Sequence, residues 1–244
     1  MVALTAQFVA RKIKKTYTAI VNGLPYESAT TNVMTSEEAY HQLGVDVDPS
    51  GDDRWQLIDH ALDEKEAITL WRSIRYANSL KANDETLTLV ELKPKTGRYH
   101  QLRRHMVRKG KPMAYPPTVL IFCCLTIIPP PFQKQAWVCE KPLVGDKGYD
   151  GGGKAVYLRQ RGLFLCSNQL LLEHPYFNTD KGRQEWESLG DAEKYAGGRL
   201  YLSESDDKVM VKVSIELPPK FESFLNAEDK RFHKERAEEG KTTE

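Results

Sequence analysis

The segment "EAITLWRSIRYANSLKANDETLTLVELKP", residues 66–94, contains two runs rich in β-branched and aromatic residues, separated by the polar "LKAND". Residues of this kind favour extended strands, and a short polar stretch between two such runs favours a turn. Pro94 cannot donate a backbone hydrogen bond to a neighbouring strand, so the second run is expected to end there. The segment therefore predicts an antiparallel pair of strands closed at Pro94.

Other parts of the chain carry strand patterns too. In "KKTYTAIVNG", residues 14–22 alternate in strand fashion and run into an Asn-Gly turn. "GLFLCSNQLLLEHP" is a long apolar segment that ends at His174-Pro175, and "KVMVKVSIELPP" alternates as a half-buried strand does. Strands outnumber helices, and they do not alternate regularly with them. We therefore predict an α+β fold with a mixed, mostly antiparallel sheet and flanking helices.

Two helices are indicated by local signals. Thr35 stands three residues before Glu38, the spacing of a capping box, which predicts a short helix there. In "YHQLRRHMVRKG", Leu102 and Met106 are four residues apart, as they would be on one face of a helix, and Gly110 would end that helix.

The chain divides into a main domain and two exceptional segments. We expect one domain over residues 1–225, followed by a charge-dense tail over 226–244 that is a solvated helix or a frayed end. Residues 113–142 form a proline-rich insertion with an apolar centre. We hypothesise that this insertion is a retained intron, because its residues can be encoded by a pyrimidine-rich tract before a CAG. If the segment is made, it is expected to be an excursion outside the core.

The composition narrows the setting. The net charge of the 244-residue chain is +1, so attraction to nucleic acid must come from local clustering. The four cysteines lack the C-x-x-C spacing of structural zinc sites, which predicts no metal and favours free thiols in a reducing, intracellular compartment. No signal peptide opens the chain, and "TVLIFCCLTII" is too short to cross a bilayer as a helix, so no membrane association is expected.

The densest basic run in the chain follows directly after Pro94. It comprises Arg98, Arg103, Arg104, His105, Arg108, Lys109 and Lys111, with Tyr99, His100 and Gln101 among them. Arginine side chains bind phosphate groups through two parallel hydrogen bonds, so a phosphate-rich partner is one interpretation. The other is an ordinary solvated helix face whose arginines pair with carboxylates, and charge alone favours that one.

The order of several sequence motifs along the chain favours the phosphate-rich partner. "KTGRYHQLRRHM" resembles the T-G-R-x-H-Q-[IL]-R-x-H signature of the RluA-like family of RNA pseudouridine synthases. "KKTYTAIVNG" resembles the family's K-x-Y-x-A-x-V-x-G strand, and "KPLVGDKGYDGG" its P-[LI]-x-G-D-x-x-Y-G element. "LFLCSNQLLLEHP" and "VSIELPPKFESFL" resemble two later elements, and all stand in the family's order between residues 8 and 225.

The resemblance implies a fold with an RNA-binding cleft and a reaction that isomerises uridine to pseudouridine in rRNA or tRNA, with no cofactor. The target uridine leaves its base stack to enter such a pocket. By position in the motifs, Tyr17 would pack on the base, and Arg161, displaced by one residue from the motif position, would pair with the essential aspartate. Arg98, His100, Gln101, Arg103 and Arg104 would organise the cleft and contact the RNA. Without the resemblance, Tyr17 would be an ordinary core aromatic.

The chain departs from the family at the catalytic group. The aspartate should belong to an H-R-L-D-x-x-T-S-G motif upstream of Tyr17, but the sixteen preceding residues include neither Asp nor Glu. Asp146 lies in a "VGD" turn and is better explained as a turn residue. The family's arginine would fall on Gly162, one residue from Arg161, and Cys166 stands where its histidine would be. We expect the aspartate in a missing N-terminal portion, and this chain to be inactive alone.

Three hypotheses remain open. The chain is an incomplete pseudouridine synthase, or a catalytically dead RNA-binding module that keeps the cleft, or a structural domain unconnected with RNA. The third requires the ordered motifs to be coincidental. The oligomeric state and the identity of the target uridine leave no trace in the sequence.

Overall fold

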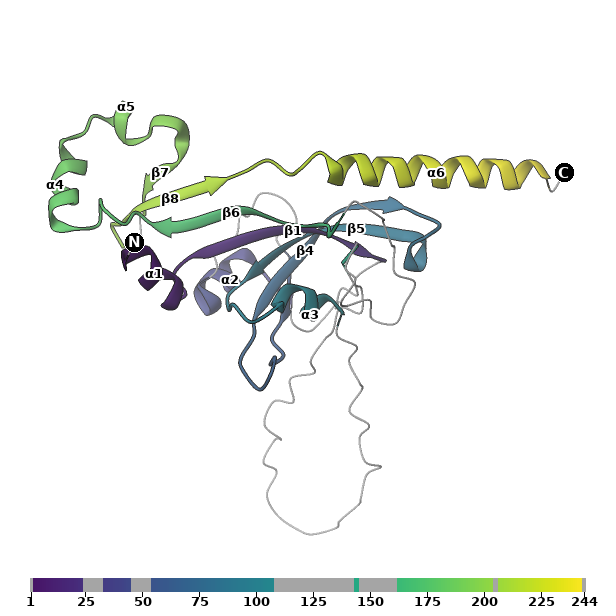
Figure 1. Ribbon diagram of the computed structural model, residues 1–244, viewed down its shortest axis with the longest axis horizontal. Coiled ribbons are helices and arrows are strands. Elements are labelled where there is room, and N and C mark those ends of the chain that lie inside the picture. The colour runs from purple at the N-terminus through teal and green to yellow at the C-terminus, as the bar shows by residue number, and fades with distance from the viewer. Residues whose placement is uncertain are drawn as a thin grey trace, which may run out of the picture.

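The computed structural model describes residues 2–23, 33–44, 54–107, 143–144, 162–203 and 206–242. An eight-stranded sheet in the order β2-β3-β4-β5-β1-β6-β8-β7 forms its centre (Figure 1). The strands are β1 (Lys14–Asn22), β2 (Val33–Met34), β3 (Trp55–Ile58), β4 (Thr69–Asn78), β5 (Thr86–Pro94), β6 (Leu165–Glu173), β7 (Leu200–Leu202) and β8 (Val209–Ser214). Every pairing between these strands is antiparallel, so the predicted α+β fold on a mostly antiparallel sheet is confirmed.

Six α-helices flank the sheet in the part of the chain described. They are α1 (Val2–Val9), α2 (Ser36–Leu43), α3 (Gln101–Val107), α4 (Asp180–Ser188), α5 (Asp191–Lys194) and α6 (Lys220–Thr242). Two short 3₁₀ turns, Asn83–Glu85 and Ala196–Gly198, complete the helical elements. None of the helices within the described ranges combines the length and the apolar character needed to cross a membrane.

The strongest strand patterns formed as predicted. β1 covers residues 14–22, and β4 pairs with β5 from Thr69 opposite Pro94 to Asn78 opposite Thr86. The capping box before α2 is also present, since the backbone N–H of Thr35 donates to Glu38 at 2.8 Å and that of Glu38 donates to the Thr35 hydroxyl at 3.2 Å. Gly110, the expected end of the α3 helix, and the 113–142 insertion lie outside the described residues.

Alternation along the strands divides the core between the two faces of the sheet. On one face, Ile20 of β1 and Leu89 of β5 pack with Phe221 and Phe224 of α6. A second cluster, in which Ala39 of α2 packs against β3 and β4, lies on the same face. Its member Leu70 stands opposite Lys93 of β5, and Lys93 points to the same side of that strand as Leu89. The opposite face carries the cluster of α3, formed by Ala19, Val21, Ile58, Trp71, Val90, Leu92, Leu102, Met106 and Leu143. Figure 1 shows α6 and α3 on opposite sides of the sheet.

Helix α6 crosses the boundary that the sequence places at residue 225. Beyond that position Glu228 is buried and accepts a hydrogen bond from the Ser79 hydroxyl at 2.8 Å. Asp229 accepts two hydrogen bonds from Asn78, one from its backbone N–H and one from its side-chain amide. The first part of the expected tail is thus a helix with contacts to the end of β4, and whether 1–225 and 226–244 behave as separate units stays a prediction.

Candidate functional site

The candidate site is centred on the turn between β5 and α3, where the basic signature lies. Leu102 and Met106 of α3 are buried against the sheet, so the helix is fixed by its apolar face. Tyr17 of β1 is half-buried and packs against the same cluster. Tyr17 and α3 therefore share one face of the sheet, the arrangement on which the sequence-based placing of the cleft depends. Tyr17 lies opposite Leu92 of β5 in the strand register.

Gln101 connects the turn to the sheet. Its side-chain amide donates to the carbonyl oxygen of Ile68 and to the hydroxyl of Thr69, both at 2.9 Å. Its amide oxygen accepts from the Thr96 hydroxyl at 2.8 Å and from the backbone N–H of Arg98 at 3.0 Å. Gln101 is only 4% exposed. Its four hydrogen bonds thus give it an organising role in the turn, and it presents little surface to a ligand.

The hydroxyl of Thr96 extends this network, since it also accepts from the backbone N–H of Ile68 at 2.8 Å. His105, on the next turn of α3, is fully buried; its Nδ1 is 2.9 Å from the Thr69 hydroxyl and its ring lies 4.4 Å from that of His60. The histidine that closes the signature motif is therefore a core residue in this fold.

The arginines of the signature differ in their surroundings. Arg98 is half-exposed and donates through Nε to the carbonyl oxygen of Glu66 at 2.8 Å. Arg104 forms a two-pronged ion pair with Asp63, with N–O distances of 2.8 and 2.7 Å. The hydrogen bond from Arg104 lowers the pKa of Asp63 below its ordinary value of 3.8. Arg103 is half-exposed on the first turn of α3.

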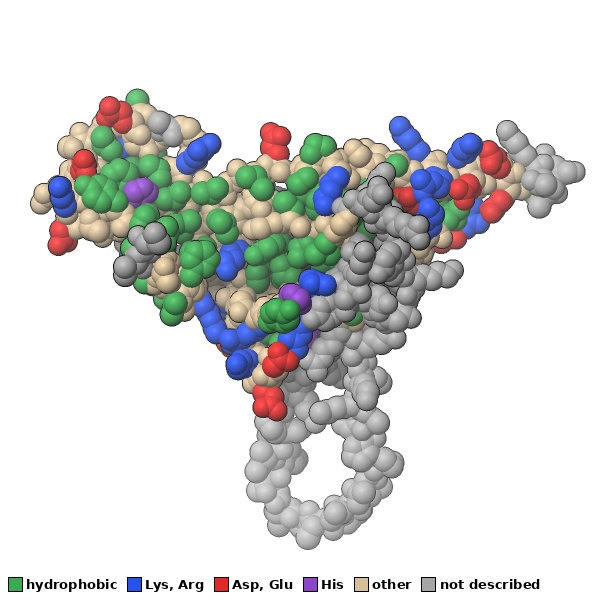
Figure 2. Space-filling model, viewed as in Figure 1, with side chains coloured by type: hydrophobic (Ala, Val, Ile, Leu, Met, Phe, Trp, Pro, Cys, Tyr) green, Lys and Arg blue, Asp and Glu red, His purple; other side chains and the backbone are tan. Residues whose placement is uncertain are grey.

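The two residues before α3 form an aromatic pair. The ring of Tyr99 stacks on that of His100, with centroids 3.8 Å apart and planes tilted by 25°. Tyr99 is 74% exposed, and His100 has a φ of +51°, which is rare for any residue other than glycine. In the space-filling view, Lys and Arg side chains lie together with Asp and Glu side chains in the region where Figure 1 places α3 (Figure 2).

The structure thus places Tyr17 on the same face of the sheet as α3, the helix that contains Gln101, Arg103 and Arg104 and that Arg98 and His100 precede in the chain. Arg161 lies outside the described residues, as does Asp146. Cys166 is a half-buried free thiol that packs against the α6 cluster, on the face opposite to Tyr17. The partners that sequence reasoning missed are His60, Asp63 and Glu66, whose segment has no periodic pattern that could have pointed to them.

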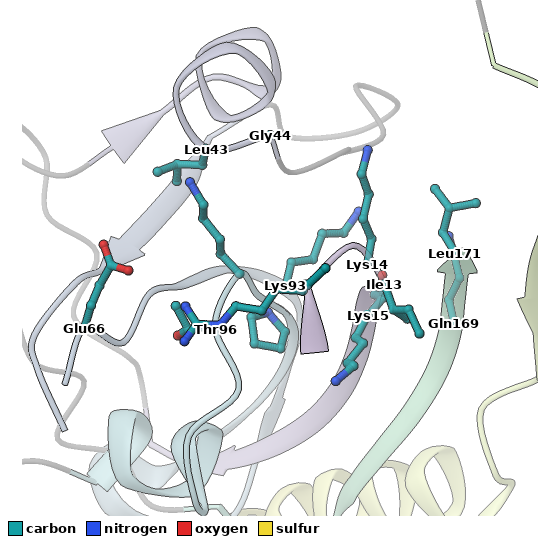
Figure 3. Close-up of a pocket in the computed structure, with 15 residues that line it drawn as sticks. Ile13, Lys14, Lys15, Leu43, Gly44, Glu66, Lys93, Thr96, Gln169 and Leu171 are labelled. Atoms are coloured by element: carbon teal, nitrogen blue, oxygen red, sulfur yellow. The ribbon is translucent and has the colours of Figure 1, made fainter. Parts of the chain in front are cut away.

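A hollow of about 260 Å³ lies near the start of β1, the end of β5 and the end of α2 (Figure 3). Five cationic residues and one acidic residue are among those that line it, namely Arg11, Lys14, Lys15, Lys93, Lys95 and Glu66. Lys93 and Thr16 alternate with Leu92 and Tyr17 along their strands, so the hollow lies on the other face of the sheet. Its lining would attract anions, and two of its residues, Glu66 and Thr96, also take part in the contacts of the turn between β5 and α3.

Comparisons with known proteins find similarity to pseudouridine synthases, the class of enzyme that the motifs indicate. Residues 1–107 match the family model described as RNA pseudouridylate synthase. The chain is 34% identical over 111 residues to the tRNA pseudouridine synthase C of Vibrio vulnificus, an alignment that covers 43% of this chain and 40% of that protein. It is 34% identical over 115 residues to the protein of the same name from Yersinia pestis, covering 45% of this chain and 40% of the relative.

The chain therefore spans well under half the length of these curated relatives. Among solved structures, human RNA pseudouridylate synthase domain containing 4 is similar with a TM-score of 0.40 and 16% identity, covering 89% of this chain and 63% of that one.

Proposed function

We propose, because residues 1–107 match the family model described as RNA pseudouridylate synthase, that the chain belongs to this family and forms the RNA-binding cleft of a pseudouridine synthase acting on tRNA. The tRNA assignment rests on the names of the bacterial relatives. In this reaction the bond from N1 of uracil to the ribose breaks and a bond from C5 to the ribose forms. The hydrogen on C5 is released, and N1 takes up a proton.

The observation that supports this proposal most directly is the common cluster beneath Tyr17 and α3. Tyr17 packs against a group of side chains that includes Leu102 and Met106, so the tyrosine lies on the same face of the sheet as the helix that carries Arg103 and Arg104. An aromatic ring beside arginine side chains is suited to an extruded base and its phosphates. Arg98, His100, Arg103 and Arg104 would contact the RNA, and the hydrogen bonds of Gln101 would hold the turn that presents them.

Residues 1–244 contain no carboxylate at the position of the family's essential aspartate. An aspartate is the essential group in the family motif, and no Asp or Glu occurs in residues 1–16. We propose that Arg161 pairs with a carboxylate that this sequence does not supply at the motif position. The chain alone should then bind RNA without converting uridine. The second candidate function is a catalytically dead RNA-binding module that keeps the cleft.

The test uses tRNA carrying tritium on C5 of uridine, because isomerisation releases that label into water. We expect tight, salt-sensitive binding of the tRNA and no release of tritium above background. Release above background would overturn the proposed inactivity, and failure to bind tRNA or any other RNA would overturn the proposed function. An upstream in-frame H-R-L-D-x-x-T-S-G segment, if it restores release when joined to residues 1–244, would favour the enzyme over the binding module.

A further inference from the structure

Tyr99 is the most exposed aromatic side chain in the described part of the chain, with 74% of its surface accessible. A single exposed aromatic residue is common on protein surfaces and carries no meaning by itself. What distinguishes Tyr99 is that its ring stacks on His100, at a centroid distance of 3.8 Å. The pair presents a flat aromatic surface at the edge of the basic signature.

The backbone beneath this pair is held on both sides. The N–H of Arg98 donates to the side chain of Gln101, and the N–H of Gln101 donates to the carbonyl oxygen of Arg98 at 3.1 Å. On the other side, the N–H of Arg104 donates to the carbonyl oxygen of His100 at 2.9 Å. His100 is kept at a φ of +51°, a left-handed conformation that persists only where its surroundings enforce it.

The backbone that carries the pair is consequently organised before any ligand arrives. A ligand that stacks on a ring carried by an ordered backbone loses less conformational freedom than one that must order a mobile loop. The neighbouring side chains of Arg98 and Arg103 are half-exposed and carry positive charge. An aromatic surface with cations beside it matches a nucleic acid base with phosphates on either side.

We propose that Tyr99, supported by His100, is a stacking platform for an unpaired base of the RNA, next to the nucleotide that enters the cleft. This inference rests on the proposed function and adds the class of RNA that the site takes. Bases of a duplex already stack on one another and cannot lie on the ring, so the platform selects looped or single-stranded RNA. The platform is tolerant of base identity, because every base offers an aromatic face.

The experiment measures binding of the full chain to a fluorescein-labelled single-stranded RNA of mixed sequence and to an RNA duplex of the same length, at several salt concentrations. The variants are Tyr99→Ala, Tyr99→Phe and, as a matched control, Tyr76→Ala, which removes an exposed tyrosine of β4. Tyr99→Ala should weaken single-strand binding by roughly 5- to 50-fold, within the range measured for loss of base stacking. Tyr99→Phe and Tyr76→Ala should stay within about twofold of the wild type, because the first keeps the ring and the second lies off the platform.

Two further readouts separate stacking from charge and from folding. The slope of log affinity against log salt should be the same for Tyr99→Ala and the wild type, since stacking releases no counterions. Duplex binding by Tyr99→Ala should stay within about twofold of the wild type, which also shows that the variant is folded. Unchanged single-strand binding by Tyr99→Ala, or an equal loss for both RNAs, would overturn the platform alone. A wild-type chain that binds neither RNA would overturn the proposed function as well.

Discussion

Thr96 and Gln101 are joined side chain to side chain across the turn between β5 and α3, with 2.8 Å between the Thr96 hydroxyl and the Gln101 amide oxygen. Both side chains are buried, and both also bond to the backbone of Ile68. The turn that carries the basic signature is thus anchored to the segment before β4. A surface that must present several cations in fixed positions needs such an anchor, because like charges on a mobile loop would move apart.

Gln101→Ala should destabilise the fold by about 3 kcal/mol, because it removes four hydrogen bonds from a buried site. The partners in those bonds are the Thr96 and Thr69 hydroxyls, the Ile68 carbonyl oxygen and the Arg98 N–H. Urea denaturation measures the change in the free energy of unfolding. Gln184→Ala, an exposed glutamine of α4, is the matched control and should shift it by less than about 0.5 kcal/mol. An equally small effect of Gln101→Ala would show that the amide does not anchor the turn.

The carboxyl group of Asp63 should titrate below 3.8 in the folded chain, because Arg104 donates two hydrogen bonds to its charged form. A pKa that is lower in the folded than in the unfolded chain gives stability that is present above the unfolded-state value and is lost as the pH falls through the folded-state value. The carboxyl carbon of Asp63, followed by NMR between pH 2 and 6, measures this pKa. In Arg104→Gln it should move back toward 3.8. An unchanged titration in Arg104→Gln would mean that the ion pair is absent in solution.

Arg103→Ala should weaken RNA binding and reduce the slope of log affinity against log salt by about 1, the contribution of one phosphate contact. Arg104→Ala should have a smaller effect, because the guanidinium of Arg104 is already held by Asp63. Lys181→Ala removes one positive charge from α4, on an exposed residue outside the site, and serves as the control. Affinities measured by fluorescence anisotropy between 50 and 300 mM salt decide the outcome. Equal slopes for Arg103→Ala and Lys181→Ala would place the RNA elsewhere on the molecule.

The fold could be predicted from the sequence where a local pattern was sufficient. The alternation in β1, β4 and β5 and the capping box of Thr35 and Glu38 involve residues close in the chain, and each formed as expected. Helix α1 was not predicted, since its sequence has no capping residue and few polar positions. Helix α4 was missed as well, although Thr179 caps it and could have been recognised from its position before the helix.

The sequence nominates the site residues, which stay a prediction, but it could not give their arrangement. The motifs place Tyr17 and the signature in one group, and the structure puts Tyr17 and α3 on one face of the sheet. The roles within the group depend on contacts that no local pattern contains. Gln101 bonds to Thr69, which is 32 positions away, and Arg104 pairs with Asp63, which is 41 positions away. Long-range contacts of this kind decide which polar side chains are buried and which face a ligand.

Removal of residues 226–244 tests whether they are a detachable tail. Truncation after Leu225 would take away Glu228, which accepts from the buried Ser79 hydroxyl, and Asp229, which accepts from Asn78. It would also shorten α6 to six residues, which are too few for a stable helix. Those six residues include Phe221 and Phe224, whose side chains belong to the core. The free energy of unfolding, measured in urea, should fall by about 3 kcal/mol or more.

The control for this truncation ends the chain after Ala237, which keeps the buried contacts of α6 and removes only its exposed end. That variant should lie within about 0.5 kcal/mol of the full chain. If truncation after Leu225 were equally harmless, the contacts of Glu228 and Asp229 would contribute nothing to stability. The helix beyond Leu225 would then be a solvated tail, as the charge pattern alone predicts. A large loss would instead mean that the domain extends through α6 to at least Asp229, because those contacts close the core over the end of β4.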